Sequence, residues 1–135
     1  MVRSNQLSRL TYLSLACLAL LLAFAVHQVR AADPDAEALL GEWQGTWASA
    51  TGRSGNGPYF ITIKKVEGEK VMGRSERPAS GQSPESNWNF VGTLAGNVLT
   101  VTTADFRMEL TVNGKNMTGW SLTRGFRYNL SLAHK

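Results

Sequence analysis

FRMELTVNGKNMTGWSLTRGFRYNLSLA, the stretch from residue 106 to residue 133, alternates apolar and polar side chains three times in succession. Such alternation places every second side chain on the same face, which is typical of a half-buried β-strand. Asn113-Gly114 separates the first two alternating runs and is the strongest hairpin signal in the chain. The stretch therefore predicts three consecutive antiparallel strands, over residues 106–112, 117–123 and 126–133.

The preceding part of the chain continues this pattern with five more short strands. Short polar, glycine-containing turns separate most of them, and no helical periodicity intervenes. An antiparallel meander of eight strands removes its exposed edges when it closes into a barrel. We therefore expect an all-β fold, an eight-stranded antiparallel up-and-down barrel over residues 41–133, with polar rim loops at residues 49–57 and 78–86. The five further strands are expected at residues 41–47, 59–66, 70–77, 87–94 and 98–103.

The charge of the chain is concentrated before this barrel. The 135 residues include 14 Lys+Arg and 10 Asp+Glu, a net charge of +4, and a single cysteine, Cys17. Arg3, Arg9 and Arg30 and the cysteine all fall within residues 1–31, which contain no acidic residue. The rest is nearly neutral and lacks cysteine, which argues against a nucleic-acid partner, a disulfide-stapled domain and a cysteine-metal site.

Residues 1–31 have the layout of a secretory signal peptide. A polar start with two arginines precedes an apolar run of 14 residues, 13–26, and Val29-x-Ala31 supplies small residues before the expected cleavage point. The run is shorter than the roughly 20 residues of a membrane span, so an uncleaved anchor is the weaker alternative, as is lipidation of Cys17. We expect a periplasmic or extracellular protein without a stable membrane span, in which residues 32–40 form a flexible lead or one helical turn.

The barrel interior admits two interpretations, because a barrel of eight strands holds either side chains alone or one small ligand. Gly45, Gly73, Gly92 and Gly119 lie in mid-strand, where glycine either allows strong bending or leaves open volume for a ligand. Eight aromatic residues are expected on inward faces, as core or as ligand contacts: Trp43, Trp47, Tyr59, Trp88, Phe90, Phe106, Phe126 and Tyr128. The ligand site is predicted to use Trp47, Trp88 and Phe106 as its apolar wall and Tyr59, Ser75, Ser121 and Tyr128 as its hydrogen-bonding groups.

The usual catalytic side chains are missing after residue 31. His134 is the one histidine there and lies next to the C-terminus, so we expect no nucleophile-base pair, no zinc site, no cofactor and no enzyme. Glu42, Asp105 and Glu109 are expected on outward faces as solvated charges. The glycine-rich loop at residues 52–57 is not followed by a helix, so it lacks the geometry that binds phosphate.

Leu39-Leu40-Gly41-Glu42-Trp43, at the entry to the first strand, resembles the Gly-x-Trp start of calycin barrels, the group of lipocalins, fatty-acid-binding proteins and avidins. The resemblance implies that Trp43 plugs one barrel end and that a basic residue, Arg127 or Arg124, packs over it. It implies a non-enzymatic barrel that binds a small apolar or amphipathic molecule in its interior.

The same opening is also similar to that of small periplasmic inhibitors of secreted metalloproteases, which insert an N-terminal segment into the protease cleft. This resemblance implies the alternative function, a protein-binding inhibitor of a secreted or envelope hydrolase. Such an inhibitor would act through the lead at residues 32–40 or through the two rim loops.

Overall fold

A computed structural model describes residues 35–53, 55–81 and 83–135. The expected signal peptide and the first three residues of the expected lead lie outside these residues. The described chain consists of one short helix, α2 (Ala36–Leu39), followed by eight strands. The strands are β1 (Gly41–Ser49), β2 (Asn56–Glu67), β3 (Lys70–Arg77), β4 (Ser86–Ala95), β5 (Val98–Thr102), β6 (Phe106–Asn113), β7 (Asn116–Thr123) and β8 (Phe126–His134).

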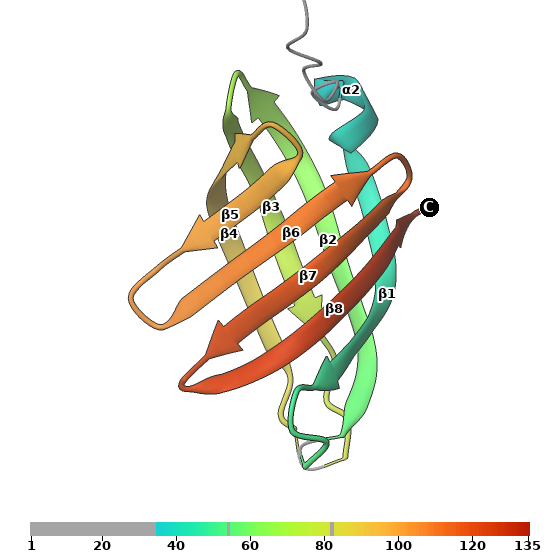
Figure 1. Ribbon diagram of the computed structural model, residues 1–135, viewed down its shortest axis with the longest axis vertical. Helices are drawn as coiled ribbons and strands as arrows, with labels where there is room; N and C mark the ends of the chain where they lie inside the picture. Colours follow the sequence, from blue (N-terminus) through green and yellow to red (C-terminus); the bar gives the residue numbers. More distant parts are fainter. Residues whose placement is uncertain (1–34, 54, 82) are drawn as a thin grey trace, which may run out of the picture. The chain divides into compact units, whose positions relative to one another are not determined.

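The strands form a closed antiparallel barrel in which each strand pairs with its neighbours in sequence, and β1 also pairs with β8 (Figure 1). Closure satisfies the hydrogen-bonding groups that an open sheet leaves at its edges. The expected all-β, up-and-down barrel is thereby confirmed. The helix in the described ranges, α2, is not long and apolar enough to span a bilayer.

Local sequence explains why these segments form strands. In β6 every second residue is buried along the whole strand, as its alternation predicts. Gly68, Gly96 and Gly114 begin two-residue turns with φ of +59°, +60° and +60°, the backbone conformation that a tight hairpin demands and glycine tolerates best. The third of these is the hairpin predicted at Asn113-Gly114.

One irregularity departs from the expected pattern in β2. The pairing of β2 with β3 shifts between Ile63 and Lys65, so that one extra residue is inserted at this point. Lys64 and Lys65 are both exposed, whereas Val66 packs against the core. Such a bulge increases the local twist of a strand, which helps a small barrel to close.

The two ends of the barrel differ, and we name them by their contents. The helix end carries α2, the start of β1 and the C-terminal residues of β8, and the loop end carries the two longest loops, residues 50–55 and 78–85 (Figure 1). A hydrogen bond of 2.9 Å from the Ser80 hydroxyl to the Asn56 carbonyl joins the second of these loops to the first residue of β2. The two ends therefore offer different surroundings for a binding site.

Candidate functional site

The helix end is closed by Trp43, which is almost fully buried. Its indole Nε1 donates a hydrogen bond of 3.0 Å to the carbonyl of Leu39, whose side chain is also buried. The His134 ring contacts Trp43 edge-on with ring centroids 4.8 Å apart, and its Nε2 lies 2.8 Å from the Leu40 carbonyl oxygen. Residues 35–40 of the expected lead are thus tied to the barrel by a helical turn and by the buried Leu39.

The expected contact between Trp43 and Arg127 is not formed. Antiparallel pairing of β1 with β8 places His134 opposite Trp43, whereas Arg127 lies at the other end of β8, near Ala50. The Arg127 side chain points outward and its guanidinium lies 4.8 Å from the ring centroid of Trp120. Arg124, the other candidate, occupies the β7–β8 turn at the loop end. His134 therefore takes the place that the resemblance assigned to an arginine.

The barrel has a hydrophobic core of buried side chains. Five of the seven predicted ligand-binding residues are buried and border neither of the two recesses described below: Trp47, Tyr59, Ser75, Phe106 and Ser121. The Tyr59 and Ser75 hydroxyls hydrogen-bond to each other at 2.6 Å. The structure therefore places these five residues in the buried interior of the barrel.

The mid-strand glycines leave no open volume beside them. A Cβ atom on Gly45 would overlap the carbonyl oxygen of Ser131, and one on Gly119 would overlap the carbonyl oxygen of Glu109. A Cβ on Gly73 would lie 2.8 Å from the Phe90 ring, and one on Gly92 would lie 2.9 Å from a Val101 methyl group. These glycines permit close approach of strands and core side chains, which agrees with the bending interpretation.

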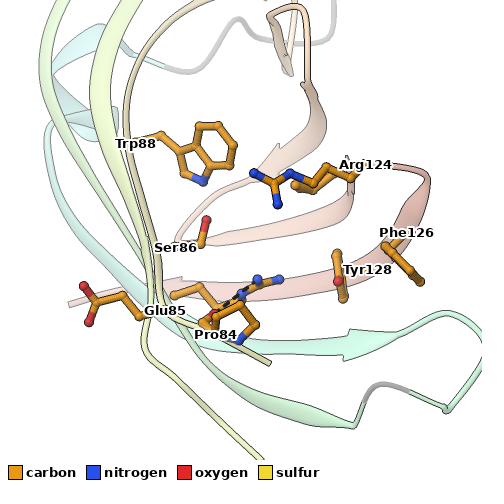
Figure 2. A pocket seen from close by; sticks show the side chains of 9 residues that line it. Pro84, Glu85, Ser86, Trp88, Arg124, Phe126 and Tyr128 are labelled. Atoms are coloured by element: carbon orange, nitrogen blue, oxygen red, sulfur yellow. Dashed lines mark hydrogen bonds between the residues drawn. The ribbon is translucent and has the colours of Figure 1, made fainter. Parts of the chain in front are cut away.

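A pocket of about 300 Å³ opens at the loop end. Two of the predicted ligand-binding residues, Trp88 and Tyr128, border it, and Trp88 stacks on Phe106 with ring centroids 5.2 Å apart. Its lining comes from the end of β3, the β3–β4 loop, the start of β4, the end of β7, the β7–β8 turn and the start of β8 (Figure 2): Arg77, Pro84, Glu85, Ser86, Trp88, Thr123, Arg124, Phe126 and Tyr128. Strand ends that are far apart in sequence thus form one recess.

Phe126 differs from the sequence expectation. It lies two residues before Tyr128 and was expected on the same inward face of the strand, yet 59% of it is exposed. It is the first residue of β8, directly after the turn, so its ring extends beyond the packed interior and borders the pocket instead (Figure 2). An exposed ring beside a recess is an available apolar contact for a ligand.

Arg77 is the pocket residue that the sequence expectations missed. Val71, Gly73 and Ser75 are buried on one face of β3, and Arg77, two residues further, lies on the same face. This alternation is the sequence signal that indicates an inward position for Arg77. Only 9% of Arg77 is exposed, and its guanidinium carbon lies 5.3 Å from the Trp47 ring centroid and 4.9 Å from that of Tyr128. The aromatic faces attract the cation and hold it inside the loop end.

Burial raises the pKa of Tyr59 above its usual 10.0, since the ionised phenolate is poorly solvated there; the hydrogen bond with Ser75 and the charge of Arg77 partly oppose this increase. Because the raised pKa belongs to the folded state, the associated stability is complete below pH 10 and is lost as the pH rises above it. We expect the free energy of unfolding to fall more steeply with alkaline pH in the wild type than in Tyr59→Phe.

Denaturant titrations at several alkaline pH values check this prediction. Near neutral pH, Tyr59→Phe should itself cost about 1–3 kcal/mol, because the Ser75 hydroxyl loses its partner. Tyr128→Phe is the control, and its free energy of unfolding should still fall steeply with alkaline pH. Equal alkaline slopes for the wild type and Tyr59→Phe would contradict the assignment.

A second hollow, of about 330 Å³, lies over β1 and β2 near the helix end. Its charged groups already pair with protein partners: Lys135 Nζ lies 3.0 Å from Glu42 Oε2, and Arg74 Nε lies 2.9 Å from Glu76 Oε1. Within the described part of the chain, no three His, Cys, Asp or Glu residues cluster as metal ligands. The loop-end pocket, with its rings and arginines, is the better candidate site.

Fold and site together define a closed antiparallel β-barrel that is plugged at one end and recessed at the other. No known protein family matches this chain, and no curated protein is significantly similar to it. The loop-end pocket is therefore the feature from which a function is inferred.

Proposed function

We propose that this protein is an exported, non-enzymatic barrel of the calycin type that binds a small amphipathic molecule in the loop-end pocket. The observation that carries the proposal is the pocket itself, whose wall combines the rings of Trp88, Phe126 and Tyr128 with the two cations Arg77 and Arg124. Recesses of roughly 300 Å³ or more, with apolar walls and a few polar groups, are typical of small-molecule sites.

The capacity of the pocket limits the size of the ligand. About 300 Å³ corresponds to roughly ten non-hydrogen atoms, if each occupies about the 30 Å³ that a water molecule takes in the liquid. A single aromatic ring with a short polar tail has this size. The part of the ligand held in the recess is therefore about the size of one ring with a short tail, at the mouth of the barrel.

The placement outside the cytosol is inferred from the signal-peptide pattern of residues 1–31. The calycin assignment is inferred from the Gly41-x-Trp43 opening, together with the closed eight-stranded barrel and the buried, plugging position of Trp43. The alternative, an inhibitor that inserts its lead into a hydrolase, is less well supported. Leu39 is buried in the barrel and its carbonyl accepts the Trp43 hydrogen bond, so this part of the lead is already engaged.

Replacing Phe126 with serine tests the location of the site. Because the ring is 59% exposed, its loss should change stability little, whereas the affinity for phenylpropanol, a neutral probe of the right size, should fall about tenfold as an apolar wall is removed. Calorimetric titration or NMR shift titration of both proteins measures the difference.

Two matched variants complete this test. Val91→Ser removes a side chain of similar exposure, 56%, that does not line either recess, and it should leave affinity unchanged. Phe60→Ser alters the second hollow and should also have no effect. Loss of binding in Phe60→Ser, with retention in Phe126→Ser, would move the site to the outer face and refute the proposal.

A further inference from the structure

Among the described residues, Arg77 has only weak contacts at the loop end. Its guanidinium lies against the rings of Trp47 and Tyr128, and the hydrogen bond from its Nη2 to the Pro84 carbonyl is 3.5 Å long. A hydrogen bond of this length is at the limit of the geometric range. The five N–H groups of the arginine are therefore poorly satisfied by the protein.

No carboxylate in the described ranges pairs with the charge of Arg77. Among the described residues Arg77 forms no ion pair, and its buried Nε has no acceptor. Trp47 Nε1 is a second buried donor without an acceptor there, although Trp47 does not border the pocket. Buried cations are normally paired, because removal from water is costly without a partner. In the described part of the chain, this end of the barrel thus has two buried donors, Arg77 Nε and Trp47 Nε1, that lack an acceptor.

Arg124 adds a second cation from the opposite side of the pocket. Figure 2 shows its guanidinium extending toward Trp88, while the carboxylate of Glu85 points away from the recess. Glu85 instead accepts a hydrogen bond of 3.2 Å from Asn87 Nδ2. Arg124 also has φ of +50°, in the left-handed region that is unfavourable for a side chain of this type. The wall of the pocket thus carries two arginines, and its one carboxylate is turned outward.

We propose that Arg77, assisted by Arg124, is the anion-binding subsite of the pocket, and that the ligand is a small molecule with a carboxylate or phosphate group on a ring-sized apolar body. Oxygen anions accept hydrogen bonds without donating any, which is what these buried donors require, and the arginine fork matches their paired oxygens. The apolar body lies against Trp88 and Phe126. This inference rests on the proposed function and specifies the charge of the ligand.

A matched series of probes tests the charge. Phenylpropanoate, phenylpropanol and phenylpropylammonium have similar bodies and differ in charge, and phenyl phosphate supplies the other anion chemistry. The purified wild-type protein should bind phenylpropanoate or phenyl phosphate about tenfold or more tightly than phenylpropanol, as expected for a charge-assisted hydrogen bond, and the ammonium most weakly. The tighter of the two acids identifies the anion class.

Arg77→Met removes the cation but retains an apolar stem of similar length. It should reduce acid affinity to about that of phenylpropanol and leave phenylpropanol binding nearly unchanged. Arg127→Met makes the same change in charge on the outer face, over Trp120, and should retain the wild-type preference. Arg77→Lys keeps the charge without the fork, and should lose part of the preference; it serves as the deciding variant if Arg77→Met does not fold.

The outcomes separate the two levels of the proposal. Failure of the wild type to bind any of the four probes would refute the proposed function and the subsite with it. Equal binding of acid and alcohol would overturn the subsite while the proposed function stands. An undiminished acid preference in Arg77→Met, or in Arg77→Lys should the former not fold, would also overturn it.

Discussion

Alanine at Gly45 or at Gly119 should destabilise the barrel by about 3 kcal/mol or more, a large part of the roughly 5–15 kcal/mol that stabilises a typical domain. The added Cβ would overlap the Ser131 carbonyl oxygen in the first case and the Glu109 carbonyl oxygen in the second. These oxygens belong to neighbouring strands, so they cannot rotate aside as a flexible side chain would. The strands must separate, and local ladder hydrogen bonds would be lost.

Denaturant unfolding, or loss of soluble protein, measures the effect. Gly52→Ala is the control, because Gly52 has φ of +72° but, among the described residues, no atom beyond its chain neighbours lies within 4 Å of the Cβ that alanine would add. It should cost about 1–2 kcal/mol for the left-handed conformation alone. If Gly45→Ala unfolds at the same denaturant concentration as the wild type, close strand approach at this position is not needed for closure.

Trp43→Ala should cost about 3–5 kcal/mol, since it empties the buried position that closes the helix end. The variant loses the contact with the His134 ring and leaves the Leu39 carbonyl without its indole donor. Trp43→Phe keeps an aromatic ring and should cost only about 1–2 kcal/mol, mostly for the missing hydrogen bond.

Trp120→Ala provides the matched control for the tryptophan plug. Trp120 is partly buried on the outer face beneath Arg127, so its removal creates no interior cavity and should cost about 1 kcal/mol. Urea midpoints of the three variants check the ranking. Equal losses of stability in Trp43→Ala and Trp120→Ala would show that the helix end does not depend on its plug.

Trp43→Phe should also retain probe binding, because the pocket lies at the opposite end.

Most of the architecture could be predicted from local patterns. Val71, Gly73 and Ser75 are buried and alternate with exposed or partly exposed neighbours, as expected for the strand predicted at residues 70–77. Gly68 and Gly114 occupy turn positions with positive φ, where glycine is favoured. The inserted residue near Lys64 was not predicted, since a bulge depends on how β2 and β3 are paired as well as on the residues themselves.

The candidate site was predicted only in part. Trp88 and Tyr128 border the pocket as expected of ligand contacts, but Tyr59 and Ser75 satisfy each other in the core. Arg77 has the same inward parity as Ser75, and the sequence expectations did not consider that an arginine would remain inside. Its place depends on Trp47 and Tyr128, which belong to β1 and β8.

The sequence by itself determined that the chain forms eight antiparallel strands and which side chains point inward, because alternation and turn chemistry act over a few neighbouring residues. Only the tertiary structure decided which inward residues fill the core and which border the pocket, and that His134 rather than Arg127 meets Trp43. The reason is that closure and stagger of the strands bring residues that are distant in sequence to the same end of the barrel. Alternation along one strand indicates which face a residue lies on, but not which residues of other strands it meets.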